Sequence, residues 1–150
     1  MITPFDEMLE GAIMFQKNFF DYVKEELIEN EAIIVDMNVE DQLYEKGITS
    51  ENIRIDSYAP YAPLTLIIKR TKHQPTNRVT LRDEGDFHSS FYLDFTDDSF
   101  TIRASDEKAK QLEFAYGSSI FGLTPENKEE LTEYYLRPAL LAKLKQHLGL

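Results

Sequence analysis

The chain has 150 residues, the length of one ordinary domain, and 42% of them are hydrophobic, with 10 Phe and 8 Tyr to fill a core. It contains no Cys, which excludes disulfides, a thiolate nucleophile and zinc or iron–sulfur sites built on Cys. The formal net charge of −11 disfavours nucleic-acid binding over most of the surface, because phosphates are bound by clustered Lys and Arg.

The first predicted element is a helix that begins at Pro4 and continues to about residue 29. Thr3 can cap it, Pro4 suits a first helical position, and Asp6 lies near the positive end of the helix dipole. Apolar side chains recur at near-helical spacing, which predicts one long amphipathic helix with an acidic outer face. These side chains are Phe5, Met8, Leu9, Ala12, Ile13, Phe15, Phe19, Val23 and Leu27.

The N-terminus carries acids where an export signal peptide needs a basic region. No apolar run approaches the roughly 20 residues of a membrane span. We therefore expect a soluble protein that makes no membrane contact and carries no export signal of its own, and the absence of Cys suits a reducing compartment.

Short elements between turns are predicted after this helix. Ala32–Val35 is an apolar run rich in β-branched residues, which can form a buried strand or the end of the first helix, and we favour the strand. Asp41–Lys46 is predicted to form a helical turn closed by Gly47. Thr49–Asn52 has the composition of a further turn.

Prolines shape the following segment. Ser57–Pro63 contains Pro60 between two tyrosines and cannot form a regular helix. Leu64–Lys69 then follows as either a strand or a short helix. Thr71–Asn77 is polar and is predicted to be an exposed loop.

The most regular strand pattern lies between residues 87 and 104. Side chains alternate in character from Phe87 to Phe95 and again from Phe100 to Ala104, with a turn at Thr96-Asp97-Asp98 between them. We predict an antiparallel hairpin with one buried face. In the first strand that face would hold Phe87, Ser89, Phe91, Leu93 and Phe95.

A short helix is predicted after the hairpin. Ser105 can cap it at its start, since a serine hydroxyl accepts from the free N–H groups of a first turn. The helix would cover Asp106–Tyr116 and end at Gly117 as a left-handed cap.

The last predicted helix starts at Thr124-Pro125 and runs to Gly149. Pro138 lies inside it, and an interior proline costs about 3 kcal/mol or forces a kink. We therefore expect a kink or break near Tyr134–Arg137.

No internal repeat, low-complexity segment or linker marks a second domain. The elements together predict a single α+β domain over residues 1–150. It would combine a long N-terminal helix, a small antiparallel sheet with a central hairpin, and a C-terminal helix kinked near Pro138.

Charge is segregated along the chain. Residues 57–82 hold five bases and no acid, whereas residues 1–56 hold 14 acids and 4 bases. The bases can belong to an exposed loop that pairs with acids of the same chain, or to an interface that docks on an acidic neighbour or lines a channel for DNA. The candidate interface residues of this basic segment are Lys69, Arg70, Lys72, Arg78 and Arg82, with His73 among them.

A polar cluster follows the basic segment. Asp83, Asp86 and His88 could bind a metal ion with Glu84 as a base, which would make the chain a metal-dependent hydrolase or nuclease. Asp83 precedes the turn at Gly85 and no second His lies nearby, so we favour a turn that leads into a strand. No nucleophile elbow, P-loop or dinucleotide fingerprint occurs, and we expect no catalysis and no cofactor.

Four segments carry a resemblance: Asp41–Ile48, Tyr58–Ala62, Val79–Ser90 and Tyr135–Leu140. They resemble a family of small tailed-phage proteins of the head–tail joining and tail-completion type. In that family a T-G-x-x-x-x-S stretch opens the sheet and an R-P-A-L stretch begins the final helix. Here Glu84 stands where the family has Thr before the glycine.

The resemblance implies a structural component of the phage neck or tail, which works as a homo-oligomeric ring and joins other phage proteins. Its partners would be copies of itself and other neck or tail proteins, and DNA could pass through the lumen of the ring. Its location would be the virion, and the host cytoplasm during assembly. The resemblance implies no catalytic residue.

Overall fold

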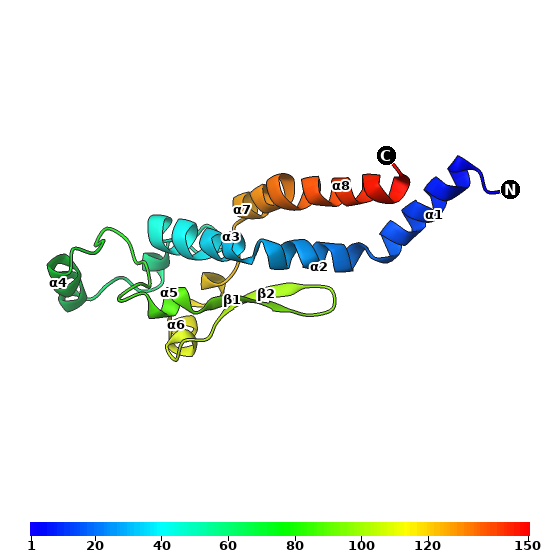
Figure 1. Ribbon diagram of the computed structural model, residues 1–150. Coiled ribbons are helices and arrows are strands. Elements are labelled where there is room, and N and C mark those ends of the chain that lie inside the picture. Colours follow the sequence, from blue (N-terminus) through cyan, green and yellow to red (C-terminus); the bar gives the residue numbers. More distant parts are fainter. The chain divides into compact units, whose positions relative to one another are not determined.

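The computed structural model describes residues 1–150 and combines helices with one small sheet, which confirms the α+β fold class (Figure 1). Its internal contacts divide the chain into two compact units. Unit 1 comprises Met1–Asn30 and Glu129–Leu150, and unit 2 comprises Glu31–Lys128. The single domain over residues 1–150 stays a prediction. None of the helices has both the length and the apolar character that a membrane crossing requires.

Unit 1 is helical throughout and draws on both ends of the chain. An aromatic cluster ties the ends together, because the Tyr22 hydroxyl lies 2.8 Å from Nε2 of His147 and the Phe15 ring lies 6.0 Å from the His147 ring. The helical segments are α1 (Pro4–Lys17), α2 (Phe19–Glu29), the π-helical η4 (Leu131–Leu136) and α8 (Arg137–Leu148).

The N-terminal helix starts as predicted but is interrupted. Thr3 Oγ1 accepts from the N–H of Asp6, and an Asp6 carboxylate oxygen accepts from the N–H of Thr3, so a full capping box forms. The predicted single helix is divided at Asn18 into α1 and α2. The Asn18 side chain donates to the carbonyl oxygen of Met14 at 2.9 Å, and this local hydrogen bond competes with helix continuation.

The predicted distortion near Pro138 is confirmed. The six residues before α8 form the π-helical η4, and the C-terminal helix is bent by 38°. A proline carries no N–H and crowds the preceding turn, which favours such a distortion. Gly149 ends α8 with φ of 74° in the left-handed region, where a glycine carries no Cβ penalty.

Unit 2 contains the sheet and several short helices. Figure 1 shows α4 at one end of this unit, away from the hairpin turn. The helices are α3 (Glu31–Asp36), the π-helical η1 (Met37–Lys46), the 3-10 turns η2 (Ile55–Ser57) and η3 (Ser118–Ile120), α4 (Pro63–Thr71), α5 (Asp86–Ser89), α6 (Ala109–Tyr116) and α7 (Pro125–Glu130), which reaches two residues into unit 1. The strands are β1 (Phe91–Phe95) and β2 (Phe100–Ala104).

The strand favoured for Ala32–Val35 is wrong, because these residues lie in α3. Burial continues at helical spacing from Ile34 into η1, where Leu43 is also fully buried. The β-branched run therefore belongs to one long buried helical face, and that packing overrides its strand propensity. The predicted end of this helix is confirmed, since Gly47 adopts φ of 62° and ψ of 41°.

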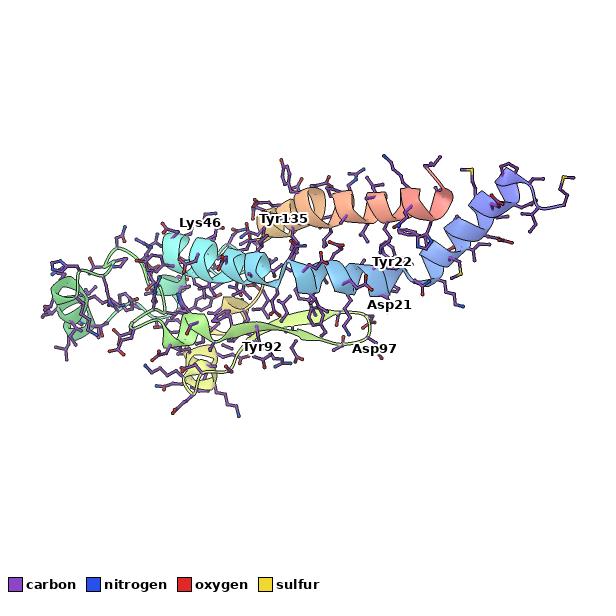
Figure 2. All side chains as sticks on the ribbon, in the orientation of Figure 1. Asp21, Tyr22, Lys46, Tyr92, Asp97 and Tyr135 are labelled. Carbon is purple, nitrogen blue, oxygen red and sulfur yellow. The ribbon has the colours of Figure 1, made fainter.

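The hairpin is confirmed, with a shorter first strand than predicted. Leu93 pairs with Ile102, both are buried, and Tyr92 projects from β1 while Asp97 marks the turn (Figure 2). The predicted strand start at Phe87–Ser89 is wrong, because these residues form the helical turn α5. The Ser89 hydroxyl donates to the carbonyl oxygen of Asp86 at 3.1 Å. This hydrogen bond satisfies a backbone carbonyl group that no neighbouring strand pairs.

The predicted cap of the short helix is wrong. The helix α6 begins at Ala109, and its Ncap residue Lys108 makes no side-chain cap. Ser105 instead bonds to the residue that precedes β1, because its N–H donates to the carbonyl oxygen of Ser90 at 3.1 Å. Gly117 ends α6 with φ of 89° but ψ of 164°, which lies outside the left-handed helical region.

Polar side chains of η1 hold the segment between α6 and α7 in place. Asn38 donates to the carbonyl oxygen of Ile120 at 2.9 Å and accepts from the N–H of Gly122 at 2.9 Å. Gln42 does the same one turn later, toward Gly122 and Thr124, at 2.9 Å in each case. Because both amides are buried and paired, they satisfy backbone groups that no sheet or helix satisfies.

Candidate functional site

The basic segment consists of Lys69, Arg70, Lys72, Arg78 and Arg82. It begins on the last turn of α4, so the open choice between strand and helix for Leu64–Lys69 is settled as helix. The loop predicted for Thr71–Asn77 is exposed at its two ends and half-buried at Gln74–Thr76.

Lys69 does not lie on the surface. Its side chain is buried, with 6% of the residue exposed, and Nζ donates to the carbonyl oxygen of Arg82 at 2.9 Å. The same ammonium group lies 4.8 Å from the centre of the Tyr61 ring. A buried charge is stable only with such partners. The placement of Lys69 outside the core, on an exposed loop, is therefore wrong.

Arg78 and Arg82 bind the segment to η1. Nε of Arg78 donates to the carbonyl oxygen of Tyr44 at 2.6 Å, and the two guanidinium groups lie 5.6 Å and 4.7 Å from the Tyr44 ring centre. Arg82 also lies 3.6 Å from a carboxylate oxygen of Glu40. Both arginines therefore have partners within their own chain.

Lys72 and Arg70 differ in their pairing. Lys72 donates to Asp83 at 2.8 Å, and this hydrogen bond raises the pKa of the Lys72 ammonium group and lowers the pKa of the Asp83 carboxyl group. Both side chains are exposed, so the pair adds little to stability. Arg70 is exposed, and its side chain makes no hydrogen bond or ion pair. Of the five bases, Arg70 has the charge that is most available to a partner.

The four residues of the alternative metal cluster, Asp83, Glu84, Asp86 and His88, are not brought together. No group of three or more His, Asp and Glu side chains is placed to hold a metal ion. Asp83 is paired with Lys72, Asp86 is exposed, and Nε2 of the buried His88 lies 2.9 Å from the carbonyl oxygen of Thr80. The structure therefore uses His88 as a core residue.

An exposed apolar surface on α4 was not predicted. Leu64, Ile67 and Ile68 follow the i, i+3, i+4 spacing of one helical face, and Leu64 and Ile67 are 67% and 58% exposed. Arg70 borders this stripe on the same helix. These four residues are called the α4 face. Their spacing was present in the sequence, but it became meaningful only once the segment was known to be a helix.

A second exposed apolar surface lies on α1. Phe5, Leu9 and Ile13 recur every four residues and form one stripe, in which Phe5 is 71% and Ile13 is 55% exposed. Asp6 and Glu10, each one position further along the chain, border the stripe on one side. These five residues are called the α1 face. The long amphipathic pattern predicted from the sequence contained this stripe but did not show that it is exposed.

The candidate site thus comprises two exposed helix faces, each apolar along its centre. The border of the α4 face is basic, and the border of the α1 face is acidic. No family model matches this sequence, and the comparisons with curated proteins and with solved structures find no match either.

Proposed function

We propose that this chain is a structural assembly protein of a tailed phage, which joins neck or tail components as a homo-oligomeric ring. The observation that carries the proposal is the pair of exposed apolar faces on α1 and α4. Contiguous apolar surface that stays exposed marks a place where another protein binds. Two such faces on one chain give it the two contacts that a subunit in a ring needs.

The four segments that resemble the phage family also support the proposal, because three of them pack on one another in unit 2. A Cβ added to Gly47 would lie 3.0 Å from Cβ of Arg78 and from the carbonyl oxygen of Val79. The N–H of Thr80 donates to the Tyr61 hydroxyl at 3.0 Å. The resembling residues thus build the framework from which α4 projects.

The proposed partners are further copies of this chain and other proteins of the neck or tail. Passage of DNA through the ring lumen is part of the same proposal. Arg70 and Lys72 are the exposed bases of the basic segment, and such side chains bind phosphate. The proposed location is the virion, reached from the host cytoplasm during assembly.

Two measurements test this function together. Mass spectrometry of purified particles of the phage that encodes the chain should detect it as a virion protein. Sedimentation velocity of the purified chain over a concentration series should show self-association. A chain that is absent from particles and monomeric at every concentration would refute the proposal.

A further inference from the structure

We propose that the α4 face of one copy binds the α1 face of a second copy, so that the chain assembles head to tail. This inference rests on the proposed function, because it names the contact through which the copies associate. Its observations are the exposure, the spacing and the bordering charges of the two faces.

The α4 face lies on a helix whose orientation is fixed, as a protein-binding surface requires. Lys69, on the opposite side of the same helix, is anchored by its hydrogen bond to Arg82, and this contact fixes which side of α4 turns outward. The outward side then carries Leu64 and Ile67, whose burial would gain free energy in proportion to the apolar area removed from water.

The α1 face is the matching surface. Its stripe from Phe5 to Ile13 runs through most of a 14-residue helix, so it is long enough to cover the nine-residue α4. Asp6 is already engaged in the capping box with Thr3, whereas Glu10 is exposed and its side chain makes no hydrogen bond or ion pair. Glu10 is therefore the free acid that an incoming Arg70 can meet.

Charge decides which faces pair. The charged residue that borders the α4 face is Arg70, whereas Asp6 and Glu10 border the α1 face. Pairing two α4 faces would oppose Arg70 to Arg70, and pairing two α1 faces would oppose acid to acid, which disfavours both. The contact between unlike faces is attractive. Because its two sides differ, it is heterologous, and repetition of such a contact produces a closed ring or a filament.

The absence of Cys from the chain allows a direct test by cross-linking. Ile67→Cys and Leu9→Cys are made in separate chains that carry tags of different size, and the two proteins are mixed with a short bismaleimide reagent. Because each cysteine lies in a different chain, any product reports a contact between copies. We expect a heterodimer from the mixture and only weak products from either variant alone. Phe114→Cys, on an exposed residue of α6 outside both faces, replaces Ile67→Cys as the matched control and should give no heterodimer.

A charge exchange tests the same contact without cross-linking. Arg70→Glu and Glu10→Arg should each raise the dissociation constant about tenfold, because an attractive exposed pair becomes a repulsive one. The double variant Arg70→Glu/Glu10→Arg should recover most of the wild-type affinity. Sedimentation velocity measures the association, and circular dichroism confirms that each variant keeps its helical content.

The outcomes separate this inference from the proposed function. The head-to-tail contact would be overturned by an oligomer that cross-links only between two Ile67→Cys chains, only between two Leu9→Cys chains, or not at all. The assembly function would still stand. The same holds for a chain that is present in phage particles but monomeric in isolation, since its faces would then bind other proteins. A double variant that fails to recover affinity would also overturn the contact between Arg70 and Glu10.

Discussion

The buried His88 should make the fold sensitive to acid. Only 5% of the residue is exposed, and Nε2 lies 2.9 Å from the carbonyl oxygen of Thr80. A carbonyl oxygen can only accept, so Nε2 carries the proton and donates it. The other ring nitrogen, Nδ1, is buried without a hydrogen-bond partner. Protonation of His88 would therefore place a new charge in the core.

Burial lowers the pKa of His88 from 6.5 to about 4. The positive charges of Arg82 and Lys69 also lower this pKa, whereas the hydrogen bond to Thr80 raises it. Between these two pH values the unfolded chain binds a proton that the folded chain does not. The contribution of His88 to the unfolding free energy should be fully present above pH 6.5. It should fall as the pH drops from 6.5 to about 4. The loss amounts to about 3 kcal/mol, at roughly 1.4 kcal/mol for each pH unit.

Urea denaturation of the wild type and of His88→Gln, over a series from pH 8 to pH 4, measures this effect. Glutamine keeps an N–H that can donate to the carbonyl oxygen of Thr80 but cannot take up a proton. We expect similar stabilities at pH 8 and a wild-type deficit that grows by about 3 kcal/mol toward pH 4. Carboxylates titrate in both proteins, so their contribution cancels in the difference. Equal losses in the two proteins would refute the reasoning.

Three further predictions test the packing. Lys69→Ala should lower the unfolding free energy by about 1–3 kcal/mol, because it removes a hydrogen bond to a backbone carbonyl. Arg70→Ala, on an exposed residue, should change it by less than about 0.5 kcal/mol. Equal losses in urea denaturation would contradict the assigned burial. Asn38→Ala should lower it by about 1–3 kcal/mol because it leaves two backbone groups without partners, and an unchanged thermal midpoint would count against the buried network. Gly11→Ala should cost about 1–3 kcal/mol and raise amide exchange in α1 and α8, because the added Cβ would overlap a backbone oxygen of α8; unaltered exchange would mean that the two helices do not pack closely.

Features that depend on a few neighbouring residues were predicted correctly. The Thr3 cap, the left-handed Gly47 and the strand pair around Leu93 and Ile102 follow from side chains within one turn or one hairpin. Their chemistry is local, because each satisfies or orients backbone groups a few residues away. The bend before Pro138 belongs to the same class.

Features that depend on distant residues were missed. Ala32–Val35 has a strand-like composition but lies in a helix whose buried face continues through η1. Lys69 looks like any basic loop residue until Arg82 and Tyr61 are placed beside it. In the candidate site, the charges of the basic segment were found from the sequence, whereas the division between bound and available charges was not.

The sequence by itself determined where α1 begins, where η1 and α8 end, where the hairpin turns, and how charge is segregated along the chain. Only the tertiary structure decided which polar groups are buried and which apolar groups stay exposed. Asn38 is buried because backbone groups 82 and 84 positions later need its amide, and α4 shows Ile67 to solvent because Lys69 is anchored on the opposite side. Burial is set by partners that the fold brings together, and no local pattern encodes which partners those are.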